Sequence, residues 1–295
     1  MKLLFLDHEP RNVFPVFKNC ENKLSYILRG SDISNFIQTS KYILKRVIKG
    51  KEKNESNKFF LRLLNDSILG IKINFRGYFL NNEGEILCEI KNIASVRYGE
   101  GFDISINKIL KKNKIEMQNG QFLLIADRGI KLSPQSYTTG TIAAMYITES
   151  SFTCYRNGIF ARPVNDFNHH VPKGFRCIVP QIYVNEDVET SAVFMNFSSD
   201  PNYSKKASPK MTLLNHKNER LEGTYKTLQP FGSYEQSLTE TFGKDVKEFL
   251  MPGKGYGTLI AEQTDVTLSS IHLIRNHKQN TLGIEHTRPT HMYVI

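Results

Sequence analysis

The chain has 295 residues, a formal net charge of +10 and an apolar fraction of 40%. These values are ordinary for a soluble globular protein and suffice for about two domains with separate cores. The charge favours nucleic acid, anionic membranes or acidic glycans as partners, or it reflects only a solvated basic surface. No aromatic-rich RNA-binding motif and no zinc-finger spacing accompanies it, so the nucleic-acid signature is weak.

The N-terminal sequence MKLLFLDHEPRNVF reaches the acidic Asp7 too early to contain the apolar core of a signal peptide. No apolar run approaches the length of about 20 residues that a transmembrane helix needs. Four widely spaced cysteines, none in a CxxC pair, predict free thiols; they are Cys20, Cys88, Cys154 and Cys177. We therefore expect a soluble protein of the cytoplasm.

The first predicted element is an amphipathic helix over residues 31–50, which begins a helical N-terminal extension. Ser31 or Asp32 can cap its start, because a side-chain oxygen there accepts an orphan backbone N–H, and Gly50 marks its end. The apolar residues fall mostly at helical spacing; they are Ile33, Phe36, Ile37, Ile43, Leu44, Val47 and Ile48. A polar linker follows over 49–58.

This predicted helix carries the candidate polyanion-binding residues, which are Lys41, Lys45, Arg46 and Lys49. A basic amphipathic helix can bind an anionic membrane, a polyanion or the acidic face of a protein. It can equally pack its apolar side on the neighbouring domain and leave its charges to solvent, and we favour this packing. A second basic segment, KILKKNK, lies at 108–114.

After residue 58 the chain consists of short apolar segments separated by Gly, Asn and Ser clusters. The segment FDISIN at 102–107 alternates apolar and polar residues with period two, the pattern of a strand with one buried face. Many such strands with no helices between them predict antiparallel β-sandwiches or barrels.

A sequence pattern occurs twice. YFLNNEGEIL at 78–87 returns as TLLNHKNERL at 212–221, and GQFLLIAD at 120–127 returns as GYGTLIAE at 255–262. The blocks keep their order and nearly constant spacing, which predicts a duplicated β domain, although chance similarity among strand–turn patterns is the alternative. Gly84 aligns with Asn218, and both residues tolerate the left-handed backbone of a tight hairpin turn.

The predicted fold is therefore mainly β, with two tandem, internally duplicated antiparallel β-sandwich domains after a short helical extension. The extension and linker cover residues 1–58, the first sandwich 59–163, and the second sandwich with its leading linker 164–295.

Candidate metal ligands gather near the C-terminus; they are His272, Glu285, His286 and His291. If IHLIR and GIEHT form a hairpin, His272 lies across from Glu285 and His286, and imidazole with carboxylate can hold zinc or iron. No HExxH, HxH or facial-triad spacing is present, and adjacent strand residues point to opposite faces. Hydrogen-bonded or exposed strand histidines are the alternative.

No catalytic residue can be assigned, because no nucleophile elbow, phosphate loop or paired Cys–His motif occurs. The function that we predict is a non-catalytic binding or accessory module, whose loops contact a protein or an acidic carbohydrate. The alternative is a metal-dependent enzyme or metal-binding protein that uses the C-terminal histidines. No cofactor is predicted apart from that zinc or iron, and self-association is left open.

Overall fold

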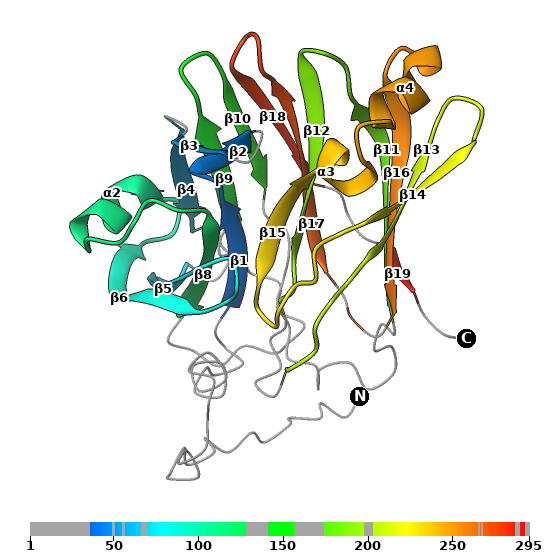
Figure 1. The fold of residues 1–295 in the computed structure, drawn as a ribbon. Coiled ribbons are helices and arrows are strands. Elements are labelled where there is room, and N and C mark those ends of the chain that lie inside the picture. Colours follow the sequence, from blue (N-terminus) through cyan, green and yellow to red (C-terminus); the bar gives the residue numbers. More distant parts are fainter. Residues whose placement is uncertain are drawn as a thin grey trace.

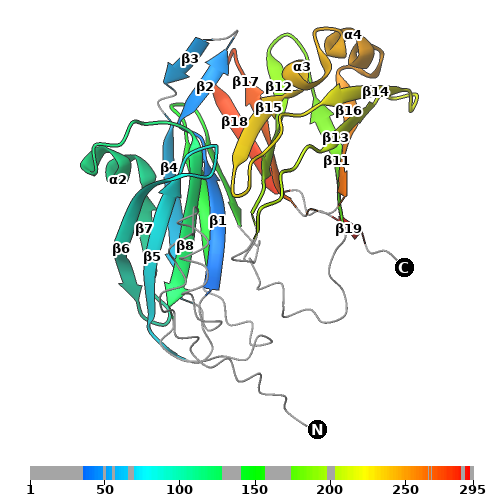
Figure 2. The same ribbon diagram turned by 60° about the horizontal axis from the view of Figure 1, so that its bottom comes forward.

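The computed structural model describes residues 36–48, 51–54, 57–65, 70–127, 141–156, 174–197, 203–264, 266, 268–286 and 290–292. These residues form four antiparallel sheets of four or five strands, as the alternating segments predict, and one two-stranded ribbon; Figures 1 and 2 show the two halves of the chain side by side. Within the described part of the chain, no helix is long and apolar enough to cross a membrane.

The first half contains two four-stranded sheets. Sheet I has the order β1 (Phe36–Tyr42), β8 (Gly120–Asp127), β5 (Ile73–Leu80) and β6 (Ile86–Val96). Sheet II has the order β10 (Phe152–Arg156), β9 (Thr141–Ile147), β4 (Lys58–Leu64) and β7 (Gly101–Ser105). Helix α2 (Ile106–Lys112) follows β7, and β2 (Lys45–Ile48) pairs with β3 (Lys51–Asn54) in a small ribbon.

The second half contains the other two sheets. Sheet III has the order β14 (Arg220–Thr224), β13 (Lys210–Leu214), β16 (Tyr256–Thr264), β11 (Gly174–Tyr183) and β19 (Thr290–Met292). Sheet IV has the order β15 (Ser233–Ser237), β12 (Val188–Met195), β17 (Ser269–Asn276) and β18 (Thr281–His286). Helices α3 (Leu238–Phe242) and α4 (Val246–Leu250) and the short η3 (Met251–Gly253) follow β15.

The strand order of the second half repeats that of the first. Sheet III has the order of sheet I when β11 takes the place of β1, β16 that of β8, β13 that of β5 and β14 that of β6; only β19 is added. Sheet IV has the order of sheet II when β18 takes the place of β10, β17 that of β9, β12 that of β4 and β15 that of β7. In each half a helix directly follows one of these equivalent strands: α2 follows β7, and α3 follows β15. A serine caps the start of each helix, since the side chains of Ser105 and Ser237 accept an orphan backbone N–H. Duplication as the origin of this arrangement stays a prediction.

The two aligned turns have the same hydrogen bonds. Asn81 Oδ1 accepts from the backbone N–H of Glu83 and Glu85, and Asn215 Oδ1 accepts from those of Lys217 and Glu219. The aligned residues after them, Gly84 and Asn218, both have positive φ values, 87° and 61°. The hairpin interpretation of the repeated pattern is confirmed.

The helix predicted over 31–50 is wrong in its described part. Residues 36–42 form β1, which pairs along its whole length with β8, and residues 45–48 form β2. β1 therefore belongs to sheet I of the first half. The six residues 39–44 are all buried, polar and apolar alike, so the segment has no exposed face of the kind that an amphipathic helix requires.

β12, a central strand of sheet IV, is buried on both of its faces. Ala192 and Phe194 of β12 belong to the core of the second half, whereas Val193 between them belongs to the core of the first half. Four further residues of β17 and β18 join that first-half core: Ile271, Leu273, Leu282 and Ile284. The halves consequently share one continuous apolar interface.

Candidate functional site

Lys41 lies inside the contact between the two halves. It is fully buried, and its Nζ donates to Asn82 Oδ1 and to Ser233 Oγ, both at 2.7 Å. Burial lowers the pKa of Lys41 to about 7, an effect that the nearby carboxylates of Glu235 and Glu83 partly oppose. The prediction that Lys41 binds a polyanion is therefore corrected, because its ammonium is enclosed between the halves.

Two of the other three candidates of that segment, Lys45 and Arg46, lie in β2 of the β2–β3 ribbon. The Lys45 side chain is mostly buried and forms an ion pair with Glu116, with 2.5 Å between Nζ and Oε1. The backbone of Arg46 lies in β2, but its side chain and the whole of Lys49 are outside the described residues. The four basic residues therefore do not share a helix face, and polyanion binding by Arg46 and Lys49 stays a prediction.

The first copy of the repeated hairpin contacts the second half directly. The carbonyl of Asn82 accepts from Ser233 N at 2.8 Å, and Glu83 pairs with Lys226 across the interface at 3.2 Å. A Cβ added at Gly84 would lie only 2.7 Å from the carbonyl oxygen of Pro230. This turn was predicted from its sequence, but its partner was not.

The predicted β17–β18 hairpin is confirmed, and His272 lies directly opposite Glu285 in it. The Nε2 of His272 is 3.3 Å from Glu285 Oε2, and the imidazole is buried whereas the carboxylate is mostly exposed. Burial lowers the pKa of His272, and Glu285 opposes that effect. Burial therefore favours the neutral form of the imidazole.

The two remaining metal candidates, His286 and His291, lie in different sheets. His286 pairs with Ile271 in sheet IV, whereas His291 lies in β19 of sheet III opposite Phe175; neither side chain is described. Among the residues that are described, no three His, Cys, Asp or Glu side chains come together in a group that could hold a metal ion. A metal site that includes His286 and His291 stays a prediction.

The basic segment 108–114 forms an exposed surface on α2. Ile106 and Leu110 face the core, which leaves the lysines of the helix and its following turn in solvent. We call Lys108, Lys111, Lys112 and Lys114 the α2 lysine surface. Within the described part of the chain, no carboxylate forms an ion pair with any of these four ammonium groups.

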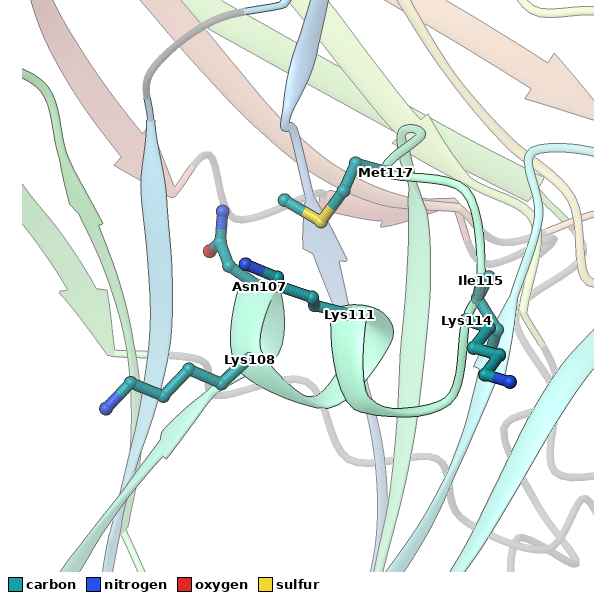
Figure 3. A pocket seen from close by; sticks show the side chains of 6 residues that line it. All are labelled: Asn107, Lys108, Lys111, Lys114, Ile115 and Met117. Carbon is teal, nitrogen blue, oxygen red and sulfur yellow. The ribbon is translucent and has the colours of Figure 1, made fainter.

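A cavity of about 400 Å³ opens beside this helix. It is lined by Asn107, Lys108, Lys111, Lys114, Ile115 and Met117. In Figure 3, Met117 lies over Lys111 and Asn107, whereas Lys108 and Lys114 extend away from the helix. Figures 1 and 2 place α2 on the flank of the first half that is farthest from the second half. The surface is therefore accessible to a large partner.

The corresponding helix of the second half has no such surface. α3 carries Glu240 in its first turn, where its side chain accepts from the backbone N–H of Ser237 at 2.7 Å. The following segment mixes both signs of charge, with Lys244, Asp245, Lys247 and Glu248. The lysine surface thus distinguishes two halves that otherwise have the same strand order.

No protein-family model matches the chain, and no curated protein matches it in sequence. Among solved structures, a glycosyl hydrolase family 2 member from Bacteroides cellulosilyticus is 10% identical with a TM-score of 0.18, and the alignment covers 86% of this chain and 28% of that one. β-Glucuronidase 2 from Bacteroides uniformis is 13% identical with a TM-score of 0.15, at coverages of 86% and 26%. The chain spans less than a third of either structure, and neither score is high enough to indicate a shared fold.

Proposed function

We propose that the protein is a non-catalytic binding module that holds an acidic partner, a protein or an acidic glycan, on the α2 lysine surface. The observation that carries this proposal is a set of four exposed lysines, three of which line one cavity, without an ion-pairing carboxylate among the described residues. Unpaired ammonium groups at one site attract an anionic partner and raise its association rate.

The geometry of the helix supports this role. Ser105 Oγ accepts from the backbone N–H of Lys108. Asn107 fixes the first turn, because its Oδ1 accepts from Phe59 N in β4 and its Nδ2 donates to the carbonyl of Asn57 just before that strand. Ile106 and Leu110 anchor the inner side of the helix. A short helix that is held in this way presents its lysines from a rigid base, which reduces the entropy lost on binding.

The apolar part of the cavity adds a second element of recognition. Ile115 and Met117 line it beside the lysine side chains, so a partner that combines carboxylates or sulfates with an apolar group fits both parts. A flexible Met side chain adapts to ligands of different shape. This combination favours an acidic protein segment over an inorganic anion.

A triple charge reversal tests the proposal. We expect Lys108→Glu, Lys111→Glu and Lys114→Glu together to weaken binding to heparin or polyglutamate by at least about tenfold, because exposed ion pairs contribute roughly 0.2–1 kcal/mol each and each reversed charge also repels the anionic partner. Fluorescence anisotropy at several salt concentrations measures the affinity. The slope of log affinity against log salt should also become shallower.

The matched control reverses three exposed lysines of the second half, Lys206, Lys217 and Lys254. Both triple variants change the net charge by the same amount. If the control loses as much affinity as the α2 variant, the interaction follows net charge alone and the proposed site is wrong.

The alternative function is metal binding at the C-terminal histidines, and the contact between His272 and Glu285 favours it. Element analysis of the purified protein tests this alternative. Stoichiometric zinc or iron that is lost in both His272→Ala and His286→Ala would support it, and a metal-free wild-type protein would contradict it.

A further inference from the structure

Strand β7 forms an exposed edge of sheet II. Among the described residues it pairs only with β4, so its other side has no partner strand there. Gly101, Phe102 and Asp103 are all exposed, and 43% of the Phe102 surface is accessible to solvent. An edge strand of this kind offers backbone N–H and C=O groups that can bind a further strand.

The hydrogen bonds of the turn before β7 show which of its backbone groups point outward. Asn65 N donates to Glu100 O at 3.1 Å, and Gly99 N donates to Asn65 O at 2.8 Å. Hydrogen-bonded and non-hydrogen-bonded pairs alternate along antiparallel strands. The pair that follows, at Gly101, and the pair at Asp103 are therefore non-hydrogen-bonded. The N–H and C=O groups of Gly101 and Asp103 consequently point away from β4.

The equivalent edge of the second half is occupied by a peptide segment. β15 follows a turn with the same backbone hydrogen bonds, so Ser233 takes the place of Gly101. Ser233 N donates to the carbonyl of Asn82 at 2.8 Å. The next residue of that segment, Glu83, forms an ion pair with Lys226 at 3.2 Å. An acidic turn is thus held on this edge by one backbone hydrogen bond and one lysine.

Lysines lie beside the edge of β7 as well. β7 ends at Ser105, whose side chain accepts from the backbone N–H of Lys108, the first member of the α2 lysine surface. Figure 2 places β7 and α2 on the same flank of the first half. Asp103 forms a two-point ion pair with Arg62, at 2.7 and 2.6 Å, which weakens its repulsion of an acidic partner. The other nearby carboxylate, that of Glu100, belongs to the end of β7 opposite α2.

We propose that the acidic partner is a protein segment that binds as an added strand on the edge of β7 and places its carboxylates on the α2 lysine surface. This inference rests on the proposed function and selects a protein over a glycan, because a glycan has no row of backbone amides to pair with Gly101 and Asp103. A side chain opposite Phe102 in the added strand lies on the same face as its ring. An apolar residue at that position covers the exposed part of Phe102.

Two probes test the proposal: a peptide of alternating valine and glutamate, which can form a strand, and heparin, which cannot. Asp103→Pro removes an outward N–H and leaves the hydrogen bonds with β4 in place. It should raise the dissociation constant of the peptide about fivefold relative to Asp103→Ala, which removes the same carboxylate but keeps the N–H. The two variants should bind heparin equally well. Fluorescence anisotropy measures these affinities.

Hydrogen exchange of the wild-type protein gives a second readout, which does not depend on how Asp103→Pro folds. Bound peptide should slow the exchange of the Gly101 and Asp103 amides, whereas bound heparin should not. If Asp103→Pro also loses heparin, this exchange measurement decides. Unchanged exchange at both amides, or equal peptide affinity of the proline and alanine variants, would overturn strand addition.

The triple lysine reversal on α2 separates this proposal from the proposed function. It should weaken both probes, whereas Asp103→Pro should weaken only the peptide. Loss of both probes in the lysine variant, without any effect at β7, would leave the lysine surface as the site and favour a glycan. No loss of either probe in the lysine variant would contradict the proposed function itself.

Discussion

Gly84→Asn is expected to destabilise the protein by about 2–3 kcal/mol, although the repeat itself has asparagine at the corresponding Asn218. Asparagine tolerates a positive φ, so the backbone conformation does not account for the loss. The cost arises from the contact, because a Cβ at this position would lie 2.7 Å from Pro230 O and 2.8 Å from Phe231 C. Real Cβ atoms do not approach backbone atoms so closely, and the two halves must separate locally to admit the side chain.

The reciprocal substitution provides the control. Asn218→Gly changes the exposed turn of the second half and should alter the free energy of unfolding by less than about 1 kcal/mol, since glycine also adopts the left-handed conformation. Urea denaturation of both variants, analysed at a common m-value, makes the comparison. Similar losses in the two variants would show that the first hairpin is not held against residues 230–231.

This pair of turns also shows how far sequence reasoning reaches. The Asn–x–x–Gly/Asn pattern predicts the turn because its hydrogen bonds are local, between residues at most four apart. The carbonyl of Pro230 that contacts Gly84 lies far along the chain, and no local pattern predicts that contact. The one sequence feature that indicates this contact is Gly84 itself, which stands where the second copy has Asn218.

The helix prediction fails at β1 for a related reason. A strand with one buried face alternates between apolar and polar residues, but β1 is covered on both sides and loses that alternation. Its buried Thr39 and Lys41 obtain partners from Gln121 and Ser233, which the sequence cannot place beside them. The apolar residues that remained matched a helical spacing by chance.

The candidate sites show the same difference between local contacts, which the sequence predicts, and distant contacts, which it does not. The strand pairing of His272 with Glu285 could be predicted because the two strands form a short hairpin. The position of His291 could not, because β19 joins a different sheet by pairing with β11. The α2 lysines were recognised as a basic segment, but only the burial of Ile106 and Leu110 shows which side of the segment faces solvent.

Lys41→Met is expected to remove a rise in stability with pH that the wild-type protein shows between pH 7 and pH 9. The pKa of Lys41 falls from its ordinary value of 10.5 to about 7 in the folded protein, mainly because burial penalises the charged ammonium. Between these two values the unfolded chain binds more protons than the folded protein, so stability increases with pH. Below pH 7 both states are largely protonated, and the folded protein bears the full cost of the buried charge.

The surroundings of Lys41 suit the neutral amine. Its two N–H groups match the two acceptors at 2.7 Å, Asn82 Oδ1 and Ser233 Oγ. The charged groups that act on it come from both halves: Glu83 and Glu235 raise its pKa, and Lys226 lowers it. Among the described residues, neither carboxylate forms an ion pair with the ammonium, so burial remains the dominant effect.

The expected gain is about 2 kcal/mol from pH 7 to pH 9, since a full proton difference changes stability by about 1.4 kcal/mol per pH unit. This window avoids the buried tyrosines, whose raised pKa values lower stability only above about pH 10, and His272, whose lowered pKa acts below about pH 6.5. Burial raises the pKa of Cys177 to about 11, which opposes the rise towards pH 9 equally in all the proteins compared, so the test is the difference between their profiles. Urea denaturation at each pH should show a rise in the wild type and in Lys217→Met, an exposed lysine of the second-half turn, and a flatter profile in Lys41→Met. Parallel profiles in all three proteins would mean that Lys41 stays protonated between the halves, and that the acceptors around it stabilise an ammonium.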